Sequence, residues 1–274
     1  MFKIIIMALL IFIGMVGYDN ITDKAQPTTP VQQEQQKTSK HEKSAAMALF
    51  TSLLPPKEEW PSPVHKFYLA FNMDEVIDPI RQNPNWTSLD AMSRDIPQAL
   101  IAIEDHAFYN HGAIAVEGIL RAALANINAG EVVQGGSTLT QQFVKNVFLS
   151  HEQSMERKIE EAVLSLMLED NYSKDEILEL YLNTTYFGAG STGIKQASRT
   201  YFSKAPSALT LAEAAVIASL PYAPTGLNPL ENPEGCKKRQ LLVLAAMHKY
   251  GMINQGQLAE AKAEKIRLTN GTVM

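Results

Sequence analysis

Apolar residues recur every three or four positions through most of this chain, which is the spacing of amphipathic helices. One such stripe runs through residues 150–168, another through 177–181, and a third through 214–220. Long runs that alternate apolar and polar residues, the pattern of half-buried strands, are absent from the sequence. The pattern therefore predicts a mainly α fold, with a short hairpin near residues 65–72 as the one expected exception.

Polar residues mark where these helices begin. In a capping box, a Ser or Thr side chain and a Glu or Gln three residues later satisfy each other's backbone N–H groups. Ser173 to Glu176 and Thr210 to Glu213 both fit this device, and Pro221 is expected to end the second helix. The segment Ser-His-Glu-Gln at 150–153 predicts a third helix start.

The two ends of the chain differ in character. An uncharged apolar run from Ile4 to Tyr18 follows a basic start. At about 1.5 Å per residue it reaches roughly 22 Å, less than a hydrocarbon core of about 30 Å. We interpret residues 1–18 as an uncleaved signal anchor, with a cleaved export signal as the alternative. Residues 19–45 are poor in apolar side chains and predict a flexible tether, which leaves residues 46–274 for a single folded domain.

Composition excludes some classes of protein. With 274 residues, 46% hydrophobic and 19% charged, the chain is neither fibrous nor wholly disordered. Its formal net charge of −5 argues against a nucleic-acid partner, which usually requires a basic excess. The single Cys236 rules out an internal disulfide framework.

A carboxylate pair among apolar residues stands out in the stretch 102–112. Glu104 and Asp105 follow an apolar helical turn, and aromatic residues come after them. Such surroundings desolvate a carboxylate and raise its pKa toward the range of a general acid or base. The same pattern fits an exposed helix end with Phe108 in the core, so the residues alone leave both interpretations open.

Two glycines, Gly135 and Gly136, precede a predicted helix start at Thr138. Gln141 stands at the capping-box position, and Lys145 falls on the same face of the helix. The free backbone N–H groups of such a helix start suit a phosphate or pyrophosphate. An ordinary capped helix start is the alternative, and the order of residues is not that of a Walker motif.

A charged triplet follows further along the chain. Glu161 lies four residues after Arg157 and three after Lys158. Spacing of this kind usually makes an exposed pair worth a few tenths of a kcal/mol, roughly, and that is the default interpretation. A partly buried carboxylate held by the two cations is the alternative.

Taken together and in this order, these stretches resemble the peptidoglycan glycosyltransferase domain, glycosyltransferase family 51, of class A penicillin-binding proteins and monofunctional transglycosylases. The resemblance covers about residues 60–255. It rests on Glu104-Asp105 with Phe108 and His111, Gly-Gly-Ser-Thr-Leu-Thr-Gln-Gln at 135–142 with Lys145, Arg-Lys-x-x-Glu at 157–161, residues 174–183, Tyr186-Phe187-Gly188 and residues 239–247.

The resemblance implies a lysozyme-like, two-lobed helical domain with a cleft between a larger lobe and a smaller, membrane-facing one. It also implies polymerisation of lipid II. The donor is a glycan on undecaprenyl pyrophosphate, and the acceptor is the 4-hydroxyl of an incoming lipid II. Glu104 matches the catalytic base, which takes the hydroxyl proton as the oxygen attacks the anomeric carbon with inversion. Glu161 matches a second glutamate, which supports the site around the donor's pyrophosphate.

Other positions match residues that bind the substrate. Arg121 and Lys145 match basic residues that contact the phosphates. No cofactor is expected to be required; Mg²⁺ or Mn²⁺ helps some relatives, but the sequence has no dedicated metal-ligand cluster. The remaining predicted substrate-binding residues are His111, Ser137, Thr138, Gln141, Gln142, Arg157, Lys158 and Asn183.

The chain departs from the family pattern at three positions. After His111 the family usually has one intervening residue, a Gly and then an Asp two residues beyond it. Here the Gly follows the His directly, and Ala113 and Ala115 take the two places. Gln153 stands where relatives often carry an Arg that helps to hold phosphate. We expect activity from this chain, with altered details of phosphate binding.

The resemblance also sets expectations for partners and location. The catalytic domain is expected outside the cytoplasm, on a single-pass protein of the cell membrane, with lipid II and the lipid-linked glycan as partners and other cell-wall synthesis or division proteins as candidates. Neither Ser-x-x-Lys nor Lys-Thr-Gly occurs, so no transpeptidase activity is expected. A murein-cleaving enzyme on a related fold and an inactive membrane-tethered scaffold are the rival interpretations.

Overall fold

The computed structural model describes residues 68–274, apart from Phe71 and residues 130–134 and 150–153. Residues 70–274 form one compact unit, and the preceding unit lies almost wholly outside the described residues. No helix in the described part is both long and apolar enough to cross a membrane. The predicted anchor at 1–18 and the tether at 19–45 fall outside that part.

Helices make up the regular structure of the described residues, as the apolar spacing predicts, and the two β-bridges found there are isolated. Of the hairpin expected at 65–72, the described residues 68–70 are helical, so that expectation is wrong there. The α-helices are α4 (Asp74–Arg81), α5 (Asp95–Glu104), α6 (Val116–Ala129), α7 (Leu139–Phe148), α8 (Met155–Asn171), α9 (Lys174–Thr184), α10 (Ile194–Phe202), α11 (Leu211–Ser219), α12 (Pro233–Lys249) and α13 (Gln255–Ala263), with 3₁₀ turns η2 (Leu89–Ala91), η3 (Phe108–Asn110) and η4 (Pro206–Ala208).

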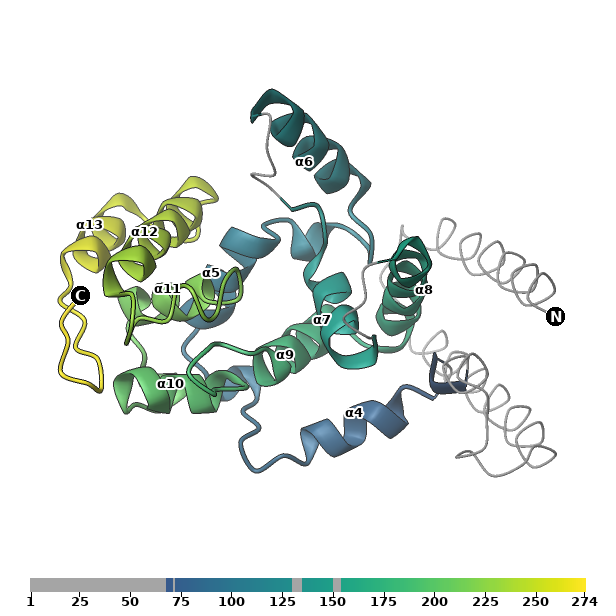
Figure 1. The fold of residues 1–274 in the computed structure, drawn as a ribbon, viewed down its shortest axis with the longest axis horizontal. Coiled ribbons are helices and arrows are strands. Elements are labelled where there is room, and N and C mark those ends of the chain that lie inside the picture. The colour runs from purple at the N-terminus through teal and green to yellow at the C-terminus, as the bar shows by residue number, and fades with distance from the viewer. Residues whose placement is uncertain (1–67, 71, 130–134, 150–153) are drawn as a thin grey trace, which may run out of the picture. The chain divides into compact units, whose positions relative to one another are not determined.

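Helix α11 is the centre of the first packed group. Every residue from Ala212 to Ser219 is buried, and four of these eight are alanines, which let neighbouring helices approach closely. Helices α5 and α12 both pack against α11 and against each other, and α13 packs on α12 (Figure 1). A helix that is apolar all round belongs in a core, and here it supports the end of α5.

A second group is formed by α7, α8 and α9, in which α7 packs against both of the others (Figure 1). Fully buried Phe143, Leu168 and Tyr181 contribute one side chain from each helix. Helix α6 extends away from both groups in Figure 1. Among the α6 side chains that the structure describes, the exposed apolar ones are Val116, Ile119, Leu120 and Ile127, each at least 44% exposed.

The predicted helix starts agree with the structure where the cap is local. Thr138, Ser173 and Thr210 each head a capping box, and α11 ends just before Pro221. The start predicted at 150–153 lies outside the described residues, and α8 instead begins after Ser154, whose hydroxyl accepts from the N–H of Arg157 at 3.1 Å. Helix starts are therefore predictable to the residue when both capping groups sit in one short stretch.

The loop after α9 depends on a glycine. Gly188 has a φ of +86°, and a Cβ there would lie 2.3 Å from the carbonyl oxygen of Pro224. We expect Gly188→Ala to lower the free energy of unfolding by about 3 kcal/mol, through backbone strain and a clash with main chain. Gly190 also has a positive φ, of +69°, but open space around its Cβ position. Gly190→Ala should therefore cost only about 1 kcal/mol, and equal losses in urea denaturation would contradict the role of the clash.

Candidate active site

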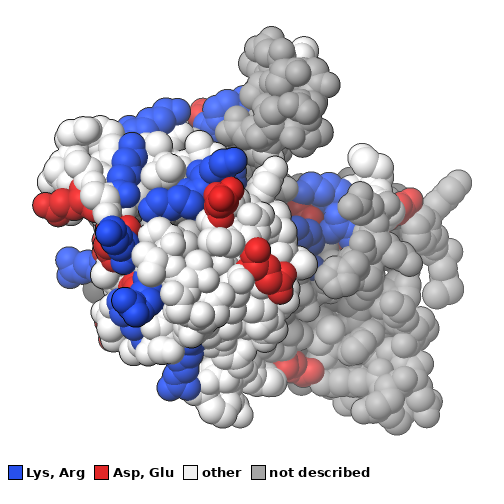
Figure 2. All heavy atoms as spheres, turned by 60° about the vertical axis from the view of Figure 1, so that its left-hand side comes forward, with Lys and Arg blue, Asp and Glu red and all other residues white. Residues whose placement is uncertain are grey.

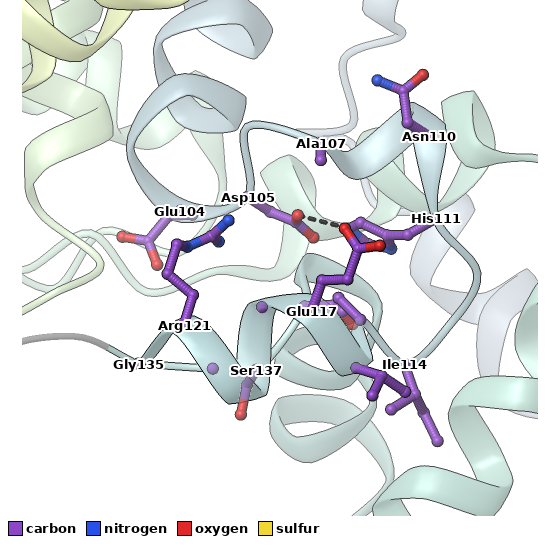
Figure 3. A pocket seen from close by; sticks show the side chains of 15 residues that line it. Glu104, Asp105, Ala107, Asn110, His111, Ile114, Glu117, Arg121, Gly135 and Ser137 are labelled. Carbon is purple, nitrogen blue, oxygen red and sulfur yellow. Dashed lines mark hydrogen bonds and ion pairs between the residues drawn. The ribbon is translucent and has the colours of Figure 1, made fainter. Parts of the chain in front are cut away.

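A cavity of about 330 Å³ lies where the end of α5, the start of α6 and the Gly-rich turn before α7 meet (Figure 3). Its lining brings together residues that are up to 34 positions apart in the chain. These residues come from separate motifs of the sequence, so the fold brings part of the predicted site together at one cavity. The predicted site residues in the lining are Glu104, His111, Arg121, Ser137 and Thr138.

Glu104 is the last residue of α5 and is partly buried. The side-chain amide of Gln142 donates to its Oε2 at 3.0 Å, and the amide oxygen of Gln142 accepts from the hydroxyl of Tyr181 at 3.0 Å. Tyr181 is completely buried, so this chain of hydrogen bonds fixes one carboxylate oxygen from behind. In Figure 3 the carboxylate points away from its neighbour Asp105.

The surroundings of Glu104 change its proton affinity. Burial raises the pKa of the Glu104 carboxyl above its ordinary value of 4.5. The hydrogen bond from Gln142 and the charges of Arg239 and Lys145 act in the opposite direction. Burial thus makes the carboxylate more basic, while the nearby cations still favour its ionised form. A carboxylate of this kind suits a general base.

Asp105 and His111 form a second unit beside Glu104. The Nε2 of His111 lies 2.6 Å from Asp105 Oδ1, and its Nδ1 lies 2.6 Å from the carbonyl oxygen of Gly112. Because the carboxylate and the carbonyl are both acceptors, they favour the doubly protonated ring, in which both nitrogens can donate. The hydrogen bond to Asp105 is the main cause that raises the pKa of His111. The dashed line in Figure 3 marks this pair.

The start of α7 is already occupied by a carboxylate. Asp105 Oδ2 accepts from the backbone N–H of Leu139 at 3.0 Å, and the Thr138 hydroxyl oxygen accepts from the N–H of Gln141 at 3.1 Å. The expectation of free backbone N–H groups here is therefore wrong for the first and third positions of the helix. Asp105 already provides the negative charge that the helix dipole favours. An anion at this site must be held chiefly by side chains.

Glu161 corrects the default interpretation drawn from its spacing. It is 2% exposed, its Oε2 accepts from Arg157 Nη1 at 3.3 Å, and its Oε1 accepts from Lys158 Nζ. Lys158 Nζ also donates to the hydroxyl of Ser137 at 3.2 Å. A buried carboxylate thus holds two cations, and one of them reaches the Gly-rich turn of the cavity.

Two further cations lie on other sides of the site. Arg121 projects from α6 into the cavity, and in Figure 3 its side chain reaches toward Glu104. Lys145 is exposed one turn beyond Gln142 on α7, close enough to influence the charge of Glu104. With Lys158, these residues place positive charge around the cavity from three different helices.

Some predicted site residues lie elsewhere or serve another purpose. Thr138 and Gln141 are buried, and their side chains complete the capping box; the Thr138 hydroxyl also donates to the carbonyl of Ala113 at 2.8 Å. Asn183 binds both the N–H and the carbonyl of Thr87, at 2.9 and 2.8 Å, and does not line the cavity. The structure thus engages these three side chains within the protein.

Three residues near Glu104 have contacts that sequence reasoning missed: Tyr181 and Arg239 were given no role, and Asp105 was considered only as one of a carboxylate pair. Asp105 links its helix to α7, Tyr181 supports Gln142, and Arg239 places its charge near the carboxylate. Tyr181 and Arg239 belong to motifs that carry the family resemblance. Membership of these motifs was the one feature of the sequence that could have indicated a role for them. No group of three or more His, Cys, Asp or Glu able to hold a metal occurs among the described residues.

A partly buried carboxylate at a cavity lined by Arg121, with Lys145 and Lys158 nearby, has the groups that acid–base chemistry on an anionic substrate would need. Comparison with known proteins identifies the family of this chain. The family model described as transglycosylase matches residues 73–248. The chain belongs to this transglycosylase family, glycosyltransferase family 51, so the resemblance drawn from its motifs and the prediction of an enzyme are confirmed at the level of the family.

Individual relatives differ in how much of their length the chain matches. It is 40% identical over 194 residues to a protein of Cupriavidus necator named as a transglycosylase, covering 71% of this chain and 84% of that one. It is 44% identical over 185 residues to penicillin-binding protein 1A of Neisseria flavescens, covering 68% of this chain but only 23% of that protein. A solved structure of penicillin-binding protein 1A from Haemophilus influenzae, 32% identical, covers 48% of this chain and 16% of that one at a TM-score of 0.34, too low to establish a shared fold.

Proposed function

We propose that this chain polymerises lipid II into glycan strands, transferring a growing glycan from undecaprenyl pyrophosphate to the 4-hydroxyl of an incoming lipid II. The observation that carries the proposal is the position of Glu104. Its carboxylate is fixed by Gln142, raised in basicity by burial, and placed at a cavity that Arg121 of α6 lines, with Lys145 of α7 and Lys158 of α8 nearby. A base next to an anion site is what this transfer requires.

In the proposed reaction, Glu104 takes the proton of the acceptor hydroxyl as that oxygen attacks the anomeric carbon. The glycosidic bond to pyrophosphate breaks in the same displacement, so the configuration inverts and no covalent enzyme intermediate forms. The proton resides on Glu104 until the product leaves. Catalysis by a positioned base contributes about 10²–10⁴ in rate.

The leaving group gains negative charge as the bond breaks, and stabilising that charge lowers the barrier. We assign this role to Arg121, Lys145 and Lys158, with Glu161 holding Lys158 in place. Three cations on separate helices suit a pyrophosphate, which carries more than one charge. We propose that no resident cofactor is required, and that a divalent cation acts only together with the phosphates of the substrate.

The exposed apolar face of α6 supports the expected contact with a membrane. Val116, Leu120 and Ile127 are 64%, 60% and 75% exposed, and Met155 at the start of α8 is 77% exposed. Apolar side chains exposed beside a site for a lipid-linked substrate suit the lipid tail or the bilayer. We therefore keep the proposal of a membrane protein with its domain on the outer face, anchored through residues 1–18.

We propose that the two packed groups of helices form the two lobes of a lysozyme-like domain. These 274 residues contain neither Ser-x-x-Lys nor Lys-Thr-Gly, so we propose that they carry no transpeptidase activity.

The pyrophosphate role predicts a specific loss of binding. We expect Lys145→Ala to weaken the affinity for undecaprenyl pyrophosphate about tenfold, because one charge-assisted hydrogen bond is removed. The matched control is Lys262→Ala, which removes an exposed lysine on α13. Equilibrium binding in detergent measures both variants, and an unchanged affinity of Lys145→Ala would count against its contact with phosphate.

Labelled substrates distinguish the proposed polymerase from a murein-cleaving enzyme. The purified protein is incubated in parallel with labelled lipid II and with labelled glycan strands free of pyrophosphate. We expect lipid II to be converted to a polymer that lysozyme digests, while the free strands stay intact. Cleavage of the strands without consumption of lipid II would support the rival enzyme, and inertness toward both would support a scaffold.

A further inference from the structure

Arg239 lies near enough to Glu104 to act on its charge, but it comes from a different part of the fold than the cations assigned to the donor. It belongs to α12, which packs against α5, whereas Arg121 and Lys145 belong to α6 and α7. Among charged groups that favour the ionised form of Glu104, Arg239 acts more strongly than Lys145. Positive charge therefore acts on the base from two separate parts of the fold.

The guanidinium of Arg239 lies over an aromatic ring. Its guanidinium carbon lies 4.1 Å from the centroid of Tyr222, a residue of the loop between α11 and α12 that is 66% exposed. A cation–π contact uses the flat face of the guanidinium, so the N–H donors along its edge remain available. The contact fixes the orientation of the group without consuming its hydrogen bonds.

One donor of Arg239 lacks a partner. Its Nε is buried and has no hydrogen-bond acceptor among the described residues. Leaving a buried donor unpaired costs about 1–3 kcal/mol, so such a group is normally explained by a structural or functional requirement. An oxygen of a substrate that enters beside Glu104 would supply the missing acceptor.

The surface around α12 carries the sign of charge that an anionic acceptor needs. Between residues 233 and 274 the sequence has seven Lys or Arg and three Glu. Figure 2 turns the side with α10–α13 toward the viewer, and basic side chains predominate over acidic ones on that face. The exposed ring of Tyr222 adds a flat apolar surface, which suits the C–H face of a sugar.

We propose that Arg239, held against Tyr222, binds the acceptor lipid II and sets its 4-hydroxyl against Glu104. This inference rests on the proposed function, because it assigns the acceptor side of the same reaction. Arg239 donates to an oxygen of the acceptor sugar or of its phosphates, and Tyr222 packs against the sugar. Arg121, Lys145 and Lys158 remain on the donor side.

The test separates donor from acceptor. A labelled lipid-linked tetrasaccharide whose own 4-hydroxyl is blocked acts only as a donor, and lipid II is varied as the acceptor. We expect Arg239→Met to raise the KM for the acceptor about ten- to hundredfold, the loss of one or two charge-assisted hydrogen bonds. The KM for the blocked donor and the affinity for undecaprenyl pyrophosphate should stay unchanged. Tyr222→Ala should raise the acceptor KM in the same way, and Tyr222→Phe should not.

Matched variants distinguish the binding of the acceptor by Arg239 from the effect of its charge on Glu104 and from general effects of changing α12. Lys238→Met, at an exposed neighbour on α12, should leave both KM values unchanged. Arg239→Met removes a cation that stabilises ionised Glu104, so the acid limb of the pH profile should move to higher pH. Arg239→Lys should restore that limb but not the acceptor KM, because it lacks the planar fork.

Each outcome supports or overturns the proposal. An acceptor KM within twofold of the native value in Arg239→Met and Tyr222→Ala overturns it, and so does a parallel rise of donor and acceptor KM. Should Arg239→Met fail to fold, the exposed Tyr222 decides alone. A native protein that forms no product would instead overturn the proposed function, which is a different result.

Discussion

Replacing Glu104 with Gln is expected to lower the rate of lipid II polymerisation by about 10²–10⁴, the contribution of a positioned general base. The amide has nearly the same shape, and its oxygen still accepts from Gln142, so folding and substrate binding should persist. The initial rate of polymer formation from labelled lipid II measures the loss. The matched control is Glu260→Gln, an exposed carboxylate on α13, which should retain the native rate.

The pH dependence of the native enzyme tests the same assignment. Burial raises the pKa of Glu104, so the carboxylate becomes protonated at a pH above the ordinary 4.5 as the solution is acidified. A protonated base cannot accept the hydroxyl proton, and kcat/KM should fall through that raised pKa. Near-native turnover by Glu104→Gln, with an unchanged acid limb, would contradict the role of Glu104 as the base.

Glu161→Gln is expected to have the second largest effect, because it acts on both stability and activity. The substitution leaves Arg157 and Lys158 beside each other without the buried carboxylate that binds them both. Breaking a buried ion pair by removal of one partner costs about 3 kcal/mol. Lys158 would also lose its fixed position at Ser137, so we expect polymerisation to fall by about tenfold or more.

Urea denaturation and initial rates measure the two effects of Glu161→Gln separately. Asp170→Asn is the matched control, since it removes an exposed carboxylate from the same helix and should change neither quantity appreciably. A Glu161→Gln protein with native stability would show that the carboxylate is not needed to hold the two cations. Native stability with lost activity would restrict its role to the site.

The sequence predicted the helices and several of their starting residues, because the chemistry of a capping box is local. Thr138, Ser173 and Thr210 each find their partner three residues away, and the structure confirms all three. The apolar spacing likewise predicted a helical protein. The ordered motifs then indicated the family, because the order and spacing of their residues can be read from the sequence without knowing where the fold places them.

Tertiary contacts explain what the sequence could not predict. Nothing in the spacing of Asp105 shows that it binds the N–H of Leu139, 34 residues later, and so removes a free donor from the expected anion site. An i,i+4 pattern has the same form whether it is exposed or buried, and at Glu161 the neighbouring helices bury it. Asn183 is similarly directed to Thr87 by a fold that brings distant segments together.

The net charge of the whole protein likewise does not predict the charges near the cavity. A formal charge of −5 describes the whole protein, yet the cavity is bordered by Arg121 and has Lys145 and Lys158 nearby. In the proposed reaction, a few cations from separate helices meet the substrate where its charge develops. Acidic side chains spread over the whole chain, many of them exposed, determine the total charge.

The most direct test of the central claim counts two products of one reaction. The native protein and Glu104→Gln are incubated with labelled lipid II, and the released undecaprenyl pyrophosphate is compared with the glycosidic bonds formed in polymer that lysozyme digests. We predict one pyrophosphate released for each bond formed by the native protein, and almost none of either from Glu104→Gln. Release of pyrophosphate without polymer, or equal polymer from both proteins, would contradict a transfer driven by Glu104.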